Sequence, residues 1–176
     1  IEIDGVGMHG LKAPENVLDM GNSGTSIRLL SGLLAPQAFD SVMTGDFSLQ
    51  KRPMGRVTTP LALMGAEIDS KEGKPPLAIK GGQRLKGIHY EMPMASAQVK
   101  SCVLLAGMYA EGRSSISEPA TTRDHTELML RGFGYDVEFA NDVLSLLGGS
   151  SLKATSLDIP AYISSAAFFL VVASLH

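Results

Sequence analysis

Residues Asp19–Ala35, DMGNSGTSIRLLSGLLA, have a counterpart in Met92–Ala110, MPMASAQVKSCVLLAGMYA. In both, a short extended segment leads into a cluster of small polar residues and then into an apolar run with small residues near its end. A third stretch, Ile159–Leu175, has the same order. The spacing is roughly 70 residues, and recurrence at a fixed period indicates a repeated structural unit.

The sequence between these stretches also repeats. Leu61–Asp69, LALMGAEID, matches Leu130–Glu138, LRGFGYDVE. Gly65 and Gly134 stand where a helix would end in a left-handed cap and pass into a strand. A turn, a second strand and a Gly-Gly pair follow in each case. The predicted unit is strand, helix, strand, helix, strand, strand.

The repeat sets approximate bounds for the elements. We expect strands near residues 16–20, 39–44, 66–69, 77–80, 87–91, 113–117, 135–139, 143–147 and 156–159. We expect helices near residues 24–35, 54–64, 96–110, 124–133 and 163–175. Pro60 lies inside the second of these helices, where its missing N–H predicts a kink or a later start.

Hydrophobic patterning predicts which layer is buried. The first helix of each unit is apolar almost all round, which is typical of a buried helix. The strands alternate, as in Glu67–Asp69, so one face of each sheet should meet solvent. The predicted class is α/β, built from inside-out repeated βαβαββ units with helices buried and sheets outside. Buried parallel helices gather their N-termini at one end, where N–H groups and helix dipoles favour an anion.

Composition limits the functional classes. The chain has 176 residues, a net charge of -3 and one cysteine, so it suits a globular protein without an internal disulfide in a reducing, cytoplasmic compartment. Its 15 basic residues are spread along the chain, which disfavours a nucleic-acid partner. The apolar run 161–175 is too short to span a membrane. The sequence opens with Ile1–Ile3 and ends in this apolar run, which predicts a piece of a longer protein.

Small polar clusters open the buried helices. Residues 21–26, GNSGTS, would let backbone N–H groups approach a phosphate or carboxylate, with Gly24 leaving space for the ligand. An ordinary N-cap is the alternative, because Asn, Ser and Thr are preferred there. Ser96, Ala97 and Gln98 occupy the same place in the next unit, and the Gln98 amide can reach a ligand. The stretch Ile163-Ser-Ser, residues 163–165, opens the last helix.

Two arginines precede the other helices. Arg52 stands before a proline at the start of the 54–64 helix, where its charge is unfavourable beside the helix dipole. It is therefore a candidate for binding a carboxylate or phosphate, a solvated surface charge being the alternative. Arg123 precedes the 124–133 helix in the same manner. Asp124 and Glu127 fit a capping box, which makes Asp124 structural and leaves Arg123 free for an anion.

Other reactive groups lack a functional pattern. Cys102 lies in mid-helix among apolar residues, which favours a core role over a nucleophile. The four histidines have no metal-ligand spacing, and no motif for a metal or nucleophile occurs. We therefore expect no metal site, and we assign no catalytic residue to this segment.

Four motifs resemble those of the EPSP synthase family. In order they are Leu18–Arg28, Gly45–Arg56, Ser96–Ser101 and Thr122–Glu127, so the resemblance runs nearly end to end and in register with the repeat. The Ser-Ala-Gln and Thr-Arg-Asp-His-Thr forms are similar to the bacterial class that differs from the enteric type.

This resemblance implies a fold and a reaction. The family has two similar inside-out domains of three units each, with substrates in the cleft between them. It transfers the enolpyruvyl group of phosphoenolpyruvate to the 5-hydroxyl of shikimate-3-phosphate, releasing phosphate, in the shikimate pathway to chorismate and the aromatic amino acids. It uses neither a metal nor an organic cofactor. Residues 1–155 would form most of the N-terminal domain and 156–176 the start of the second.

The resemblance also assigns residues to the two substrates. The phosphoenolpyruvate side would comprise Asn22, Gly24, Thr25, Arg52 and Gln98. The shikimate-3-phosphate side would comprise Ser96, Ala97, Gln98 and Arg123. The space at Gly24 implies sensitivity to the inhibitor glyphosate.

Parts of the family's site fall outside this chain. A Lys-Ser pair with an arginine would precede Ile1, and the acid/base carboxylates with further Arg and Lys would follow His176. The segment alone would then carry about half a site and should not turn over. Tyr162 stands where the family usually has Asp, near the crossover between domains, which puts closure of the domains in question.

Two alternatives remain at this point. UDP-N-acetylglucosamine enolpyruvyl transferase shares the fold and chemistry, but it would need a reactive cysteine in a loop, whereas Cys102 is predicted in a helix. A non-catalytic paralogue that binds phosphate ligands is the second.

Overall fold

The computed structural model describes residues 2–158, and residues 1 and 159–176 lie outside the described part. The predictions for the last helix, the 163–165 cluster, Tyr162 and most of the second-domain segment fall on residues that are not described. Residues 156–158 take neither helix nor strand conformation, so the strand expected near 156–159 does not begin within them.

The elements repeat in the predicted order. The first set is β1 (Leu18–Asp19), α1 (Gly24–Leu34), β2 (Ser41–Thr44), the 3-10 helix η1 (Leu49–Lys51), α2 (Gly55–Leu63), β3 (Ile68–Lys71) and β4 (Lys74–Ile79). The second set is β5 (His89–Glu91), α3 (Ala97–Gly107), β6 (Arg113–Ser117), α4 (His125–Gly132), β7 (Val137–Ala140) and β8 (Val143–Leu147). The first set differs by its short 3-10 helix.

Each set forms one four-stranded sheet, and both sheets have the same topology. The strand orders are β1-β2-β4-β3 and β5-β6-β8-β7. In each sheet the first pair is parallel and the other pairs are antiparallel. This equivalence confirms that the sequence repeat is a structural repeat.

The two glycines predicted to end helices do so in the same way. Gly65 has φ +101° and Gly134 has φ +75°, a region that favours glycine. Directly after each, the backbone N–H of Ala66 donates to Leu61 O, and that of Tyr135 donates to Leu130 O, both at 2.9 Å. These bonds close the helix C-termini and lead the chain into β3 and β7.

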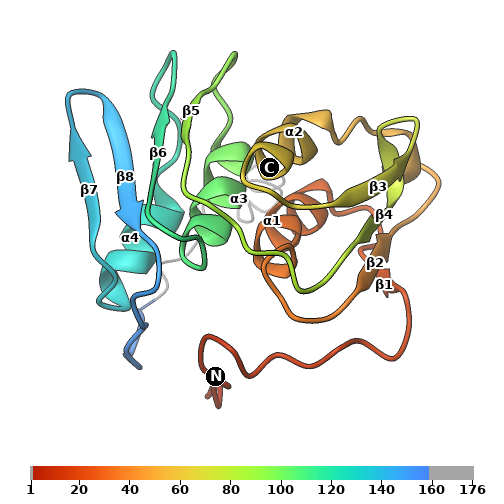
Figure 1. Ribbon diagram of the computed structural model, residues 1–176, viewed down its shortest axis with the longest axis horizontal. Helices are drawn as coiled ribbons and strands as arrows, with labels where there is room; N and C mark the ends of the chain where they lie inside the picture. The colour runs from red at the N-terminus through yellow and green to blue at the C-terminus, as the bar shows by residue number, and fades with distance from the viewer. Residues whose placement is uncertain (1, 159–176) are drawn as a thin grey trace, which may run out of the picture.

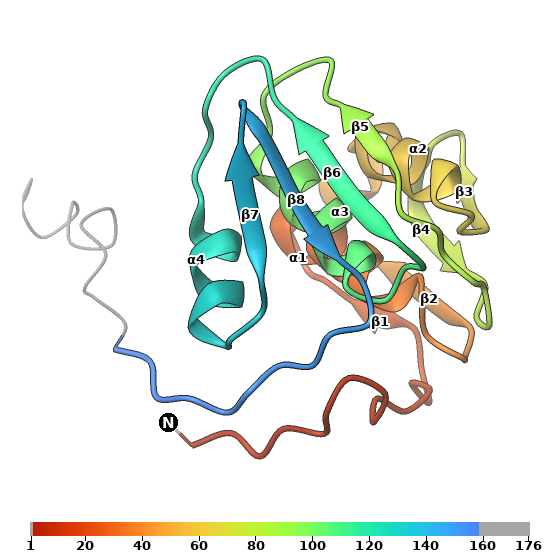
Figure 2. The same cartoon turned by 60° about the vertical axis from the view of Figure 1, so that its left-hand side comes forward.

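Helices α1 and α3 pack against one another between the two sheets (Figures 1 and 2). Their closest approach is at Gly32, whose Cα faces the backbone of Cys102 with no room for a Cβ. Helix α3 is buried on nearly all sides, whereas β7 exposes three of its four residues. The inside-out arrangement predicted from hydrophobic patterning is therefore confirmed.

The predicted start of one strand near two prolines was wrong. Strand β4 begins at Lys74 rather than near residue 77, because the turn is confined to Glu72 and Gly73, both with positive φ. Pro75 and Pro76 fall at a register irregularity, where a missing N–H is tolerated. Helix α2 begins at Gly55 and contains Pro60, so the later start considered for this helix does not occur.

Candidate anion-binding site

The starts of α1 and α3 lie beside one another. Ser23 caps α1 by accepting a hydrogen bond from Ser26 N at 3.1 Å. Ser96 caps α3 by accepting one from Val99 N at 3.4 Å. Two helix starts placed together bring their positive dipole ends to one place, which favours a bound anion.

Gln98 connects the two helix starts directly. Its Nε2 donates to Thr25 Oγ1 at 2.8 Å, and its Oε1 accepts from Arg28 Nη1 at 2.9 Å. The side chain predicted to reach a ligand is thus also held between the two helices. Because its nitrogen and its oxygen are both hydrogen-bonded, the Gln98 amide has a fixed orientation between the two helix starts.

Asn22 holds the Arg52 side chain over the start of α1. Asn22 Oδ1 accepts from Arg52 Nη2 at 2.5 Å, and Asn22 Nδ2 donates to Asp46 Oδ2 at 2.8 Å. Asp46 Oδ1 accepts from Leu49 N at 2.8 Å. The Leu49 amide, followed by Asn22, lowers the pKa of Asp46, so the carboxylate stays charged and anchors the chain of bonds.

Gly24 leaves the space that these arginines share. A Cβ at Gly24 would lie 2.9 Å from Arg52 Nη1 and 3.0 Å from Arg28 Nη1, closer than side chains normally pack. Gly24 is buried as the first residue of α1. The ends of two guanidinium groups occupy the position beside Gly24 where a Cβ would lie, and room for a ligand there stays a prediction.

Arg28, Arg52 and Arg56 form a cluster of positive charge. Burial, and then the charges of Arg56 and Arg52, lower the pKa of Arg28. Among the described residues, none of the three forms an ion pair with an acidic side chain. Like charges gathered without an acidic partner repel one another, and a bound anion would relieve that repulsion.

The residues predicted for the second anion are less closely connected. Ser96 is engaged by its own helix cap, and Ala97 is the first residue of α3. Arg123 is exposed in the segment before α4, and its side chain has no hydrogen-bond partner within residues 2–158. The structure gathers the residues predicted for the first anion at the start of α1 in two hydrogen-bonded groups, Asn22 with Arg52 and Thr25 with Gln98, on either side of Gly24. Arg123 has no hydrogen bond to either group among the described residues.

The capping box expected at the start of α4 is not formed. Asp124 is at the N-cap position, but its side chain makes no capping hydrogen bond. Glu127 instead lies with Oε1 2.7 Å from Lys100 Nζ, in an interior ion pair. The Glu127 carboxylate is stabilised more by the buried ammonium of Lys100 than by a backbone N–H, because a buried charge requires an opposite charge nearby.

Cys102 is a buried core residue, as predicted. Burial raises the pKa of its thiol to about 12, so it is not a nucleophile at neutral pH. Within residues 2–158, no group of three or more His, Cys, Asp or Glu side chains is arranged to hold a metal ion. Over the same residues, no helix has the length and apolar character needed to cross a membrane.

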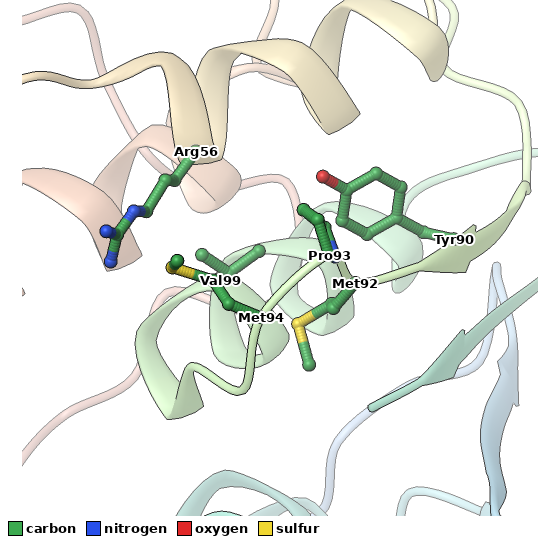
Figure 3. Close-up of a pocket in the computed structure, with 6 residues that line it drawn as sticks. All are labelled: Arg56, Tyr90, Met92, Pro93, Met94 and Val99. Carbon is green, nitrogen blue, oxygen red and sulfur yellow. The ribbon is translucent and has the colours of Figure 1, made fainter. Parts of the chain in front are cut away.

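Two hollows border the helix starts. The smaller lies between Arg56, on the first turn of α2, and the segment Tyr90–Met94 that leads into α3 (Figure 3). It encloses about 30 Å³, too little for an organic ligand. The larger, of about 440 Å³, is lined by Lys100, Glu118, Thr122 and neighbouring residues.

Sequence reasoning missed Arg28, Asp46 and Arg56. Arg28 follows Gly24 by four residues, so the two share one face of α1, and its Nη1 reaches Gly24 O at 3.4 Å. That spacing was a usable signal. Asp46 was not predictable in this way, because its role depends on Asn22, which is 24 positions away in the sequence.

The chain is similar to known proteins over nearly its whole length. The family model described as EPSP synthase (3-phosphoshikimate 1-carboxyvinyltransferase) matches residues 2–176. Proteins named 3-phosphoshikimate 1-carboxyvinyltransferase from Methylococcus capsulatus and Ruthia magnifica are 62% and 61% identical to it. Each match covers 99% of this chain and 40% of the relative, so the chain spans well under half the length of these proteins.

A solved structure agrees with the fold. The structure of EPSP synthase from Acinetobacter baumannii is 63% identical and superimposes with a TM-score of 0.89. The match covers 95% of this chain and 38% of that one.

Proposed function

The chain belongs to the EPSP synthase family, and on that premise we propose that it supplies part of the active site of an enolpyruvyl transferase. The full-length enzyme transfers the enolpyruvyl group of phosphoenolpyruvate to the 5-hydroxyl of shikimate-3-phosphate and releases phosphate. Residues 1–155 belong to the N-terminal domain and 156–176 begin the second. The reaction takes place in the cytoplasm.

The observation that carries this proposal is the convergence of Arg28 and Arg52 on Gly24, without an acidic partner in the described part of the chain. Phosphoenolpyruvate presents a phosphate and a carboxylate close together. Planar guanidinium groups bind such groups with two parallel hydrogen bonds, and the start of α1 adds backbone N–H donors. Asn22, Gly24, Thr25, Arg52 and Gln98 form the phosphoenolpyruvate side.

The start of α3 and the segment before α4 form the shikimate-3-phosphate side. Ser96, Ala97 and Gln98 lie at the helix N-terminus, and Arg123 supplies positive charge for the phosphate group. Gln98 belongs to both sides, since it already joins α1 to α3. These residues act by positioning two anions and stabilising developing charge, and the general acid and base come from outside this chain.

The properties of Cys102 argue against the related UDP-N-acetylglucosamine enolpyruvyl transferase. That reaction would need a reactive cysteine in a loop, whereas Cys102 is fully buried in α3 with a thiol pKa of about 12. The described residues offer no other cysteine.

The direct test is phosphate release by the full-length enzyme. We expect release when both shikimate-3-phosphate and phosphoenolpyruvate are present, and none when either is omitted. Glyphosate should inhibit the release in competition with phosphoenolpyruvate, because Gly24 has no Cβ that would obstruct the guanidinium groups of Arg52 and Arg28. A folded full-length protein that releases no phosphate from the complete mixture would contradict the proposal.

A further inference from the structure

A buried ion cluster joins α3 to the segment that carries Arg123. Lys100 Nζ lies 2.7 Å from Glu127 Oε1 and 3.1 Å from Glu118 Oε1. The side chains of Lys100, Glu127 and Glu118 are 4%, 5% and 16% exposed. Charges that have lost water hold their partners tightly in place. The cluster therefore fixes the first turn of α3, the residue after β6 and the first turn of α4 relative to one another.

Glu118 also organises the segment between β6 and α4. Residues 118–124 form neither helix nor strand. Glu118 Oε1 accepts from Thr122 N at 3.2 Å, and Glu118 Oε2 accepts from Thr122 Oγ1 at 2.6 Å. The same carboxylate accepts a hydrogen bond from Lys100 Nζ. The turn that precedes Arg123 is thus closed by Glu118, and Lys100 holds Glu118 against α3.

A second contact holds the other side of Arg123. Ser101 Oγ and Thr126 Oγ1 share a hydrogen bond at 2.6 Å, which joins α3 to the start of α4. Arg123 therefore stands between Thr122 and Thr126, and both of these residues are held to α3. These contacts hold the backbone of Arg123 and therefore fix the point from which its side chain reaches a ligand.

Burying this ion cluster costs free energy of folding. It combines one cation with two carboxylates, and Glu127 Oε2 has no hydrogen-bond partner among the described residues. The cation also lies in the first turn of α3, where the helix dipole disfavours it. Apolar side chains of similar volume often stabilise a protein more than a buried ion cluster does. A role in placing Arg123 accounts for charged residues here.

We propose that Lys100 is a positioning residue for shikimate-3-phosphate, which it serves by holding Arg123 at a fixed place relative to Ser96 and Ala97. This inference rests on the proposed function. The Lys100 side chain is 4% exposed, and its ammonium is paired with Glu118 and Glu127. It acts through Glu118 and the Thr122 turn, so its removal should affect shikimate-3-phosphate and leave the phosphoenolpyruvate side at α1 unchanged.

The test uses the full-length enzyme and compares Lys100→Met with Lys80→Met. Lys80 pairs with Glu67 at 3.2 Å on the surface, so its variant removes a lysine charge outside the cluster. We expect Lys100→Met to weaken shikimate-3-phosphate binding about tenfold in calorimetric titration. The KM for phosphoenolpyruvate at saturating shikimate-3-phosphate should change less than twofold. Lys80→Met should leave both values unchanged.

A double-mutant cycle separates positioning from a general structural role. If Lys100 acts through Arg123, then adding Lys100→Met to Arg123→Ala should weaken shikimate-3-phosphate binding by less than a further twofold. A full further tenfold loss in the Arg123→Ala background would overturn the proposal. An equal loss of affinity for both substrates in Lys100→Met would overturn it as well.

A milder variant covers the case in which Lys100→Met does not fold. Thr122→Val removes only the hydroxyl that donates to Glu118, and we expect shikimate-3-phosphate binding to weaken about threefold. Unchanged binding in Thr122→Val would then overturn the proposal. Phosphate release by the unsubstituted enzyme tests the proposed function separately. A failure confined to the variants concerns Lys100 alone.

Discussion

The starts of α1 and α3 occupy equivalent places in two repeats, yet they hold their candidate binding groups in different ways. At α1, the candidate side chains are bonded to one another, from Asp46 through Asn22 to Arg52. At α3, Ser96 is engaged in its own cap, and the charged group, Arg123, comes from a separate segment that an interior ion cluster holds. The same topology thus supports a directly bonded site and an indirectly positioned one.

Specificity for one anion over another depends on side chains outside the repeated helix starts. The repeat supplies two parallel helix starts with similar N-caps, which attract anions without discriminating among them. Side chains from other elements then distinguish the two starts. Arg52 comes from the turn between η1 and α2, and Arg123 comes from the equivalent place before α4. The substitutions below test whether the two starts act independently.

The largest expected effect is at the contact between the two helices. Gly32→Ala would force a Cβ into the backbone of Cys102, and the overpacking should destabilise the protein by about 3 kcal/mol. Urea unfolding of the full-length enzyme measures this as a lower midpoint. Gly55→Ala is the matched control, because a Cβ there meets no atom within 4 Å. Equal midpoints for the two variants would show that α1 and α3 do not pack as closely as described.

The next effect separates the two starts by charge. Arg52→Ala removes a guanidinium group from the phosphoenolpyruvate side, and we expect kcat/KM for that substrate to fall about 100-fold, or about 2.7 kcal/mol. Steady-state phosphate release at saturating shikimate-3-phosphate measures it. Arg84→Ala, which removes an exposed arginine elsewhere, should leave the rate unchanged. A fall of the same size in Arg84→Ala would indicate a general charge effect.

A smaller effect tests the space at α1. Gly24→Ala would place a Cβ against Arg28 and Arg52, and because the ends of these side chains can shift, the fold should be retained. We expect the KM for phosphoenolpyruvate to rise about tenfold, equivalent to about 1.4 kcal/mol, with little change in shikimate-3-phosphate binding. An unchanged KM would mean that the two guanidinium groups do not use this space during catalysis.

The smallest effect concerns Glu118, in the ion cluster beside α3, and the pH dependence of the stability of the fold. Burial raises the pKa of Glu118, but hydrogen bonds from Thr122 and Lys100 outweigh it, and the net pKa is below the ordinary value of 4.5. A depressed pKa in the folded state stabilises the fold above pH 4.5, and this stabilisation is lost as the pH falls through the folded pKa. Between pH 5 and 3, the urea midpoint of the Glu118→Gln variant should therefore fall less with decreasing pH than that of the unsubstituted enzyme. Urea midpoints that fall equally with pH in the two proteins would contradict this role of Glu118.

The fold was largely predictable because it depends on local patterns. Gly65 and Gly134 marked equivalent helix ends, and apolar runs marked the buried helices. Strands β6 and β8 were predicted to the residue. Strand β4 was predicted too short, because Pro75 and Pro76 suggested a longer turn than Glu72 and Gly73 form.

The site was predictable in composition but not in its connections. The family motifs named residues that the structure places around the start of α1, namely Asn22, Gly24, Thr25, Arg52 and Gln98. Arg28 and Asp46 lie in the same motifs but were not named. The bonds from Gln98 to Arg28, and from Lys100 to Glu118, join residues far apart in the chain, and no spacing rule reports them. For the same reason Glu127 was assigned to a cap, whereas the tertiary ion pair takes it.

The most direct test of the account is calorimetric titration of shikimate-3-phosphate into full-length enzyme carrying Arg123→Ala or Arg52→Ala. If the α3 start and Arg123 bind this substrate while the α1 start binds phosphoenolpyruvate, Arg123→Ala should weaken binding at least tenfold and Arg52→Ala by less than twofold. Equal weakening in the two variants, or a larger loss in Arg52→Ala, would contradict the division of the substrates between the two helix starts.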